Sequence, residues 1–224
     1  MIRQKQTWPF TICTVILWFA ASVFFSCSQS APEIVHASLE LVYYENGGRQ
    51  VERFTFFVLP QDDDGMENLD ELWLYHDWEG LSWQVPNKDW ISQTIDGKTW
   101  IGSRAISMED GAVLPRGQYR AVLVNKGGNR GEKSIAFDAP VIEERPFPFL
   151  ALMGDQYRID SRYPQQSLLA YDNEGNYLLT VTPSTLEGAI SSLGLPSQAE
   201  SLALWARDPA RSVSALTDII PLRY

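Results

Sequence analysis

The chain has 224 residues, of which 45% are hydrophobic and 21% are charged. This composition is typical of a folded globular protein and argues against an intrinsically disordered one. The formal net charge is −10, and without its first 26 residues the chain keeps 16 basic and 28 acidic side chains and carries −12. Because so acidic a body repels phosphate backbones and anionic lipid surfaces, no nucleic-acid partner is expected, and any membrane attachment is expected at the N-terminus.

Residues 1 to 26 are predicted to be an export signal. Met1 to Gln6 is short and basic, and Thr7 to Phe25 contains no charged residue. A basic start, an apolar run and a small residue before a cleavage site are typical of a secretory signal. The run is also nearly long enough to span a bilayer, so an uncleaved membrane anchor is the competing interpretation.

A cysteine, Cys27, follows the apolar run directly. The sequence Phe24-Phe25-Ser26-Cys27 resembles the lipobox of bacterial lipoprotein signals, which ends in a small residue followed by cysteine. It departs from that pattern at Phe24, where leucine is usual, and at Phe25, where a smaller residue is usual. The resemblance implies diacylglycerol on Cys27, cleavage before it and acylation of the new amino group, so that residues 27 to 35 form a lipidated tether to the membrane.

The other cysteine, Cys13, lies inside the predicted signal. After cleavage the chain would keep Cys27 alone, and a single free thiol on an exported protein would be chemically exposed. Lipidation removes that exposure, whereas an incidental Cys27 behind an uncleaved anchor is the alternative. The resemblance further implies a lipid-anchored protein of the bacterial cell envelope, and Ser28 is compatible with delivery to the outer membrane.

Residues 36 to 140 alternate strand-like runs with turn signals. Ala37 to Tyr44 and Val51 to Pro60 flank Asn46-Gly47-Gly48, whose tolerance of positive φ suits a hairpin turn. Glu71 to Asp77 and Leu81 to Val85 flank another short turn, and a further hairpin is expected around Asp96-Gly97. Gly117 to Asn125 and Glu132 to Asp138 flank the glycine-rich turn Lys126 to Gly131. Short strands at this spacing predict an antiparallel β-sandwich domain over residues 36–140.

The stretch from Leu114 to Val124 resembles the start of strand F in immunoglobulin-like and fibronectin type III domains. Those folds place a leucine, a tight turn and a tyrosine before an alternating strand, an order matched here by Leu114, Pro115, Gly117 and Tyr119. The resemblance implies a tyrosine corner, in which the hydroxyl of Tyr119 bonds back to the turn backbone. We therefore expect a mainly β fold with an immunoglobulin-like or fibronectin type III-like sandwich.

Residues 150–224 are predicted to be a small α+β region, separated from the sandwich by the proline-rich, charged segment Ala139 to Phe149. Residues 184–194 are predicted to be helical, because Ser184 and Glu187 have the spacing of a capping box. Gln165 to Pro183 is expected to form a hairpin with turn residues Asp172 to Asn176, and two more strands are expected in Glu200 to Asp208 and Ser212 to Leu222. A region of this size is marginal as an independent core, so packing against the sandwich is expected.

No motif in the sequence specifies a reaction. G-x-S-x-G, H-E-x-x-H and glycine-rich phosphate-binding motifs do not occur, and no cysteines and histidines have zinc-binding spacing. His76 and Asp77 are neighbours on a predicted strand and point to opposite faces, which disfavours a serine–histidine–aspartate triad. Neither a cofactor nor enzymatic activity is predicted. An envelope hydrolase, with paired carboxylates or with His76 near a serine, is kept as an alternative.

The segment from Pro60 to Glu71 is a weak candidate for a metal site. Aligned with the calcium loop of an EF-hand, it places Asp62, Asp64 and Glu71 at positions of calcium ligands. Pro60 stands where the first ligand is needed, and no flanking helices are predicted. The pattern therefore favours an acidic loop between two strands, with a loose calcium site as the alternative.

Five tryptophans lie close together in the sequence, at Trp73, Trp78, Trp83, Trp90 and Trp100. Because tryptophan is mostly buried, core packing of most of these rings is favoured. Trp78 and Trp83 lie near a turn and are the two expected to be exposed, as weak candidates for stacking on sugar rings. The expected role is non-catalytic binding or structural support, with carbohydrate or calcium binding as the alternative; the sequence identifies no protein or glycan partner.

Overall fold

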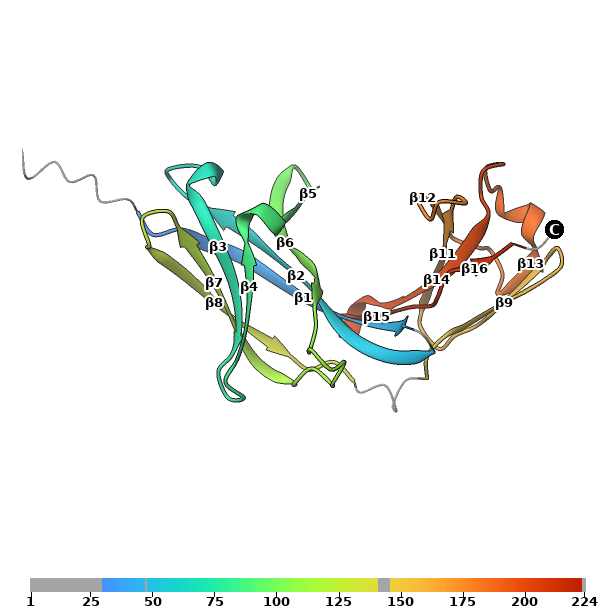
Figure 1. The fold of residues 1–224 in the computed structure, drawn as a ribbon, viewed down its shortest axis with the longest axis horizontal. Helices are drawn as coiled ribbons and strands as arrows, with labels where there is room; N and C mark the ends of the chain where they lie inside the picture. Colours follow the sequence, from blue (N-terminus) through green and yellow to red (C-terminus); the bar gives the residue numbers. More distant parts are fainter. Residues whose placement is uncertain (1–29, 47, 141–145, 223–224) are drawn as a thin grey trace, which may run out of the picture. The chain divides into compact units, whose positions relative to one another are not determined.

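The computed structural model describes residues 30–46, 48–140 and 146–222. Cys27 and the predicted signal lie outside these residues, so their assignment stays a prediction. Residues 31–224 form one compact unit. Within the described residues the fold is mainly β, as predicted, and is built from three sheets and short 3-10 helices (Figure 1). None of the helices in these ranges is long and apolar enough to cross a bilayer.

The largest sheet has nine strands. Its spatial order is β12 (Tyr177–Val181), β11 (Gln165–Tyr171), β14 (Ser201–Asp208), β15 (Val213–Leu216), β1 (Glu33–Asn46), β2 (Arg49–Gln61), β6 (Lys98–Ile106) and β5 (Ile91–Ile95), with β16 (Ile220–Pro221) paired to β14. All of its neighbouring strands are antiparallel except β1 and β15, which run parallel.

Two smaller antiparallel sheets accompany it. One has the order β4 (Leu81–Pro86), β3 (Leu69–His76), β7 (Gly117–Asn125) and β8 (Arg130–Phe137). The other has the order β13 (Glu187–Ala189), β10 (Gln156–Asp160) and β9 (Phe149–Met153). The described 3-10 helices are η1 (Met66–Asn68), η2 (Asn87–Asp89), η4 (Ile190–Leu193) and η5 (Pro209–Arg211).

The hairpins predicted from turn residues are confirmed. β1 pairs with β2, β3 with β4, β5 with β6, β7 with β8, and β11 with β12. In the turn between β5 and β6, Asp96 and Gly97 have φ angles of 50° and 72°. Two consecutive residues with positive φ are the geometry of the type I′ turn that an Asp-Gly pair favours.

The parallel pair of β1 and β15 joins distant parts of the sequence into one sheet. Leu41 lies opposite Val213, and Tyr44 lies opposite Leu216. The predicted immunoglobulin-like or fibronectin type III-like sandwich is not confirmed, because the sheet that holds β1 and β2 continues through β15 into β14, β11 and β12. The domain limits of 36–140 and 150–224 stay predictions.

The predicted helix at residues 184–194 is wrong, since this stretch forms β13 and the short η4. Its backbone is bound to the strand β10 and the turn before it. Ile159 donates to the carbonyl of Leu186 at 2.7 Å, and Ile190 donates to the carbonyl of Asp155 at 2.6 Å. Groups engaged in this way cannot make the i to i−4 bonds of a helix. The described C-terminal residues are therefore β-rich rather than α+β, and β9 and β10 form a hairpin that was not predicted.

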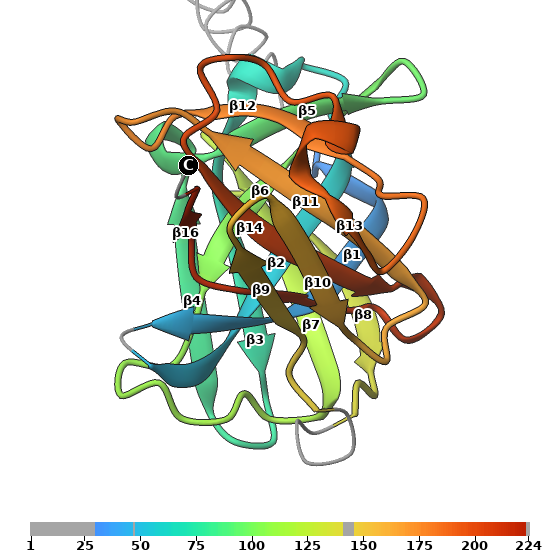
Figure 2. The same cartoon turned by 90° about the vertical axis from the view of Figure 1, so that its right-hand side faces the viewer.

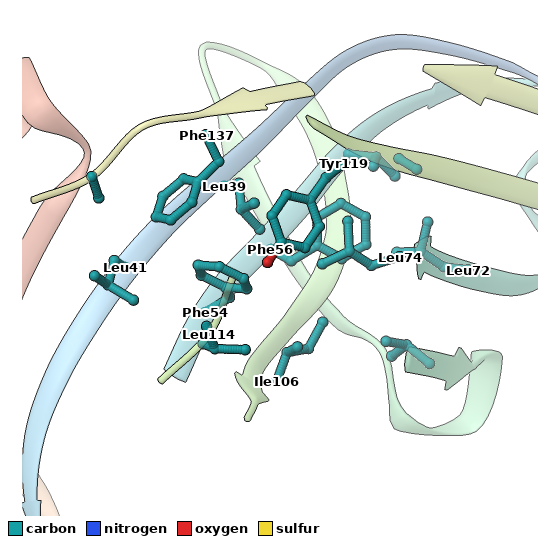
Figure 3. Close-up of a cluster of buried hydrophobic side chains, with 14 of the residues drawn as sticks. Leu39, Leu41, Phe54, Phe56, Leu72, Leu74, Ile106, Leu114, Tyr119 and Phe137 are labelled. Atoms are coloured by element: carbon teal, nitrogen blue, oxygen red, sulfur yellow. The ribbon is translucent and has the colours of Figure 1, made fainter. Parts of the chain in front are cut away.

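The two small sheets enclose two cores on the same face of the nine-stranded sheet: on β14, Leu204 belongs to one core and Ala206, two residues further on, to the other. In the first core, between β1, β2, β6 and the four-stranded sheet, the ring of Phe54 lies edge-on to Tyr119 at 5.4 Å and to Phe137 at 4.8 Å (Figure 3). The second core includes Leu168 and Leu204 from β11 and β14. Figure 2 shows β9 and β10 in front of these two strands.

The predicted hydrogen bond of the tyrosine corner is present. The hydroxyl of Tyr119 donates to the carbonyl oxygen of Pro115 at 2.7 Å, and the side chain of Leu114 is fully buried beside it. Burial raises the pKa of Tyr119, so the hydroxyl stays protonated and remains a donor at neutral pH. The local sequence therefore determined the turn before β7, although it did not determine how the sheets are connected.

Candidate functional site

The face of the nine-stranded sheet that points away from both cores carries the candidate site. Successive side chains of a strand point to opposite faces. On β2 the buried Phe54 alternates with Arg53 and Thr55, and on β14 the buried Leu204 is followed by Trp205. This alternation gives each strand one side for the core and another side that is free to contact a ligand.

This outer face is hollowed into a groove of about 710 Å³, which we call the sheet groove. Its lining side chains come from β1, β2, β5, β6, β11, β12, β14 and β15, so the groove crosses the sheet from the region of β5 to that of β12. Ligand pockets in proteins commonly have volumes of about 300–1,000 Å³. The sheet groove is therefore large enough for a ligand of several rings.

Aromatic rings are distributed along the sheet groove. Trp100 lies on β6, Trp205 lies on β14, and Tyr171 and Tyr177 lie on β11 and β12. The two tyrosine rings meet edge to face at 6.3 Å, and the ring of Tyr177 is 57% exposed. Trp100 is stacked at 6.4 Å on the imidazole of His36. Partly exposed rings at several positions along one groove provide flat apolar surfaces for a ligand.

Charged side chains lie between these rings. Three arginines, Arg53, Arg104 and Arg207, line the groove together with one acid, Glu40. The Arg207 guanidinium lies 3.5 Å from the carboxylate of Glu40 and 4.6 Å from the centre of the Trp205 ring. These partners hold Arg207 in place, whereas Arg104 is exposed.

Arg53 has no such acidic partner. Its guanidinium lies 4.6 Å from the centre of the Tyr44 ring, and no carboxylate of the described residues pairs with it. Burial lowers the pKa of Arg53, and the neighbouring Tyr44 offsets this effect only in part. Arg53 thus places a half-buried positive charge in the sheet groove without a protein counter-ion among the described residues.

The two tryptophans predicted as sugar contacts lie outside the sheet groove. Trp78 is 90% exposed in the turn between β3 and β4. Trp83 is half-buried, donates through Nε1 to the carbonyl of Ser107 at 3.0 Å, and lines a separate hollow of about 440 Å³. Only Trp83 and Trp90 of the five clustered tryptophans pack against the core, so the expectation of core packing for most of them is wrong. Trp100, by contrast, lines the sheet groove.

Two of the three carboxylates of the calcium alternative, those of Asp62 and Glu71, have local partners. Asp62 accepts a hydrogen bond of 2.8 Å from the backbone amide of Asp64. Glu71 accepts bonds from Trp73 Nε1 at 2.8 Å and from Gln84 Nε2 at 2.9 Å. Within the ranges that the structure describes, no group of three histidine, cysteine, aspartate or glutamate residues lies close enough to hold a metal ion.

His76, the histidine of the hydrolase alternative, is 2% exposed in the first core. Its Nε2 lies 3.2 Å from the carbonyl of Arg116, and its Nδ1 accepts a bond of 3.3 Å from the amide of Glu79. A neutral imidazole has one donor and one acceptor, and the backbone occupies both. His76 lines neither hollow and is positioned as a structural residue rather than as a catalytic base.

Sequence reasoning did not select Arg53, Trp205 or Arg207 as site residues. The sequence pattern that could have identified them is the alternation of side chains along a strand, which places Trp205 and Arg207 on one face and Leu204 on the other. The missing information was the pairing of β1 with β15, which places β2 and β14 in the same sheet. No local pattern specifies a contact between strands so far apart in the sequence.

The sequence matches no protein-family model and no curated protein. The structure is similar to Tp47, the 47-kilodalton lipoprotein of Treponema pallidum, with 14% sequence identity and a TM-score of 0.43. The match covers 86% of this chain and 52% of Tp47, so the chain spans about half the length of that protein. It is also similar to latent PorU of Porphyromonas gingivalis, with 15% identity, a TM-score of 0.29 and coverage of 87% and 20%. For murine CEACAM1b the identity is 12%, the TM-score 0.25 and the coverage 84% and 99%.

Proposed function

We propose that this chain is a lipid-anchored protein of a bacterial cell envelope that binds a glycan in the sheet groove. The observation that carries the binding role is the groove of about 710 Å³ with tryptophan and tyrosine rings along it. The proposed attachment is supported by the sequence Phe24 to Cys27, which resembles a lipobox. The acidic remainder of the chain supports an anchor confined to the N-terminus.

A glycan fits the chemistry of the groove. A sugar ring has an apolar face of C–H groups and a rim of hydroxyl groups. Trp100 and Trp205 offer apolar faces, and the groove also contains the hydroxyl and amide groups of Thr55, Thr180 and Gln93. These side chains can both donate and accept hydrogen bonds, as a rim of hydroxyl groups requires. Apolar surfaces with a few polar groups between them are typical of small-molecule sites.

Replacing Trp205 with alanine is expected to weaken glycan binding at least about tenfold, equivalent to ~1.4 kcal/mol. The ring would be lost from β14, which lies between β11 and β15 in the sheet that forms the groove. Glycans are first identified by screening the full-length protein on a glycan array, in a polyoxyethylene detergent because glycoside detergents would compete. The affinity of each variant for a retained glycan is then measured by isothermal titration calorimetry.

Trp78→Ala is the matched control for this experiment. It removes the same ring from an exposed turn outside the groove, so its affinity should equal that of the unaltered protein. The proposal is contradicted if the array retains no glycan, or if the Trp78 and Trp205 variants lose the same affinity. Melting temperatures of both variants show whether either loss comes from unfolding.

The protein purified from its native membrane is expected to begin at Cys27 and to carry acyl chains. Two or three chains hold a protein on a bilayer stably, with roughly 0.8 kcal/mol per buried CH₂ group, whereas one chain holds it only marginally. Intact-mass spectrometry reports the start of the chain and the added mass together. Cys27→Ala should lose the acyl mass, and the matched variant Cys13→Ala should keep it. A wild-type mass that begins at Met1 with no added lipid would contradict the proposed anchor.

A further inference from the structure

We infer that the ligand of the sheet groove is an acidic glycan, whose sugar rings carry carboxylate groups that bind Arg53 and Arg207. This inference rests on the glycan-binding role proposed above and adds the charge of the ligand. It is supported by the charge of the groove, by the register of the strands that form it, and by polar atoms in it that have no partner.

The charge of the groove is opposite to that of the protein. The whole chain has a formal net charge of −10, yet the groove lining contains three arginines, no lysine and the single acid Glu40. Glu40 is paired with Arg207, which leaves the charge of Arg53 without compensation among the described residues. A cationic groove in an acidic protein attracts anions locally, whereas the net negative charge of the whole chain repels further copies of it.

The register of four adjacent strands places two of these arginines in one row. Arg207 on β14 lies opposite Ser214 on β15, Ser214 lies beside Val42 on β1, and Val42 lies opposite Arg53 on β2. With neighbouring strands about 4.8 Å apart, the two arginine Cα atoms are separated by roughly 14 Å. Both side chains line the same groove, so the guanidinium groups flank a floor made by Val42 and Ser214.

Three polar atoms of this row have no hydrogen-bond partner in the described structure. They are Nε of Arg53, Nε of Arg207 and Oγ of Ser214, and the side chain of Ser214 is fully buried. A buried polar group without a partner destabilises the protein, and most such groups in native proteins are satisfied. One Nε–H group from each of the two guanidinium groups and one hydroxyl thus have hydrogen-bonding capacity that the described protein groups do not use, although these three atoms are themselves covered by neighbouring atoms.

A carboxylate is the anion that matches these groups. Guanidinium groups bind carboxylates through parallel, charge-assisted hydrogen bonds of fixed geometry. On a sugar ring the carboxylate projects from the rim, so the ring face can stack on Trp205 while the charge reaches the arginine row. A sugar acid therefore uses the rings and the cations of the groove at the same time, as a neutral sugar cannot.

An extended acidic peptide fits the groove less well. Peptides that bind to sheets usually add a strand to a free edge, through backbone hydrogen bonds. The strands that carry Arg53 and Arg207 are paired on both sides, and the described strands of this sheet that are paired on one side only are β5, β12 and the two-residue β16. A peptide lying across the groove would thus have no backbone ladder to join, and its own amides would stay unsatisfied.

The test compares an acidic oligosaccharide with its own neutral form and with a second acidic oligosaccharide. Full-length protein in a polyoxyethylene detergent is titrated with hexagalacturonate, with its fully methyl-esterified form and with a hyaluronan hexasaccharide, and tryptophan fluorescence and calorimetry are recorded. We expect at least one of the two acidic sugars to bind at least about tenfold more tightly than the methyl ester. Because charges in solution are screened by salt, this preference should shrink between about 50 mM and about 300 mM salt.

Arg53→Gln should remove most of the preference for the acidic sugar, and Arg207→Gln should reduce it. The matched control is Arg130→Gln, which removes the same charge from an exposed position on the four-stranded sheet and should bind as the unaltered protein does. Melting temperatures establish that each variant is folded. A preference that Arg53→Gln and Arg130→Gln reduce equally would show that overall charge, rather than this row, selects the ligand, and would overturn the inference.

Other outcomes would also overturn it. If the methyl ester binds as tightly as the acid, the carboxylates do not select the ligand. If citrate binds as tightly as the acidic sugars, or polyglutamate binds more tightly, the ligand is another anion and not an acidic glycan. If neutral sugars bind and Trp205→Ala abolishes their binding, the proposed glycan-binding function stands while the inference fails. If neither neutral nor acidic sugars bind, both fail.

Discussion

Replacing Glu52 with glutamine is expected to lower the free energy of unfolding by about 3 kcal/mol. Glu52 is 5% exposed and accepts two hydrogen bonds of 2.9 Å from the guanidinium of Arg116 and one of 2.9 Å from the amide of Leu114. Glutamine keeps the shape but removes the charge that compensates Arg116. Breaking a buried pair in this way costs about 3–5 kcal/mol, and we take the lower end because the Arg116 side chain is 19% exposed.

Thermal unfolding measures this effect directly. In a chain of this size, a loss of about 3 kcal/mol lowers the melting temperature by about 6–12 °C. Asp77→Asn is the matched control, because it neutralises an exposed acid that pairs with Arg120 at 2.8 Å and should leave the melting temperature almost unchanged. If both variants melt at the same temperature, the buried pair contributes no more than the exposed one, and the prediction is wrong.

The ion pair of Glu52 and Arg116 also positions the end of the four-stranded sheet. Burial alone would lower the pKa of Arg116, but the hydrogen bonds and charge of Glu52 raise it, so the guanidinium stays charged. Arg116 donates to the carbonyls of Ala139 at 2.9 Å and Pro140 at 3.2 Å, and the Tyr43 hydroxyl donates to the same carbonyl of Pro140 at 2.5 Å. Side chains from β1, β2 and the turn before β7 thus fix the chain where it leaves β8.

The predictions that were confirmed depend on residues close together in the sequence. Asp96-Gly97 specifies its own turn, and Tyr119 finds its partner only four residues away at Pro115. The helix expected at residues 184–194 depended on local signals too, but hydrogen bonds from β10 to Leu186 prevailed over them. A local propensity of this kind is a weak preference that tertiary pairing overrides.

The sheet groove likewise depends on strand pairings that the local sequence does not specify. The alternation of Arg53 and Thr55 with Phe54 is readable in the sequence and correctly separates a core side from a free side. What lies beside Arg53 on the free side depends on three strand pairings, one of them between residues 41–44 and 213–216. The sequence therefore shows on which side of its own strand each arginine lies, but it does not show that Arg53 and Arg207 lie in one row.

Replacing Phe54 with alanine is expected to lower the free energy of unfolding by about 3–5 kcal/mol, because it removes a fully buried ring from the first core. The ring lies edge-on to Tyr119 and Phe137 (Figure 3), and the backbones around it are held by β-sheet pairing, so the space can close only in part. Urea unfolding should show a lower midpoint with an unchanged m-value, as for a loss of packing without a change in compactness.

Phe54→Leu is the control for this prediction, since it keeps an apolar side chain and leaves a smaller cavity, and its loss should be clearly smaller. Comparing the two variants distinguishes the stability lost with the packing of the ring from the stability lost on any substitution in β2, the strand that also carries Arg53. If alanine costs no more than leucine, Phe54 is not part of a closely packed core. The four-stranded sheet would then not be held against the nine-stranded sheet by this cluster.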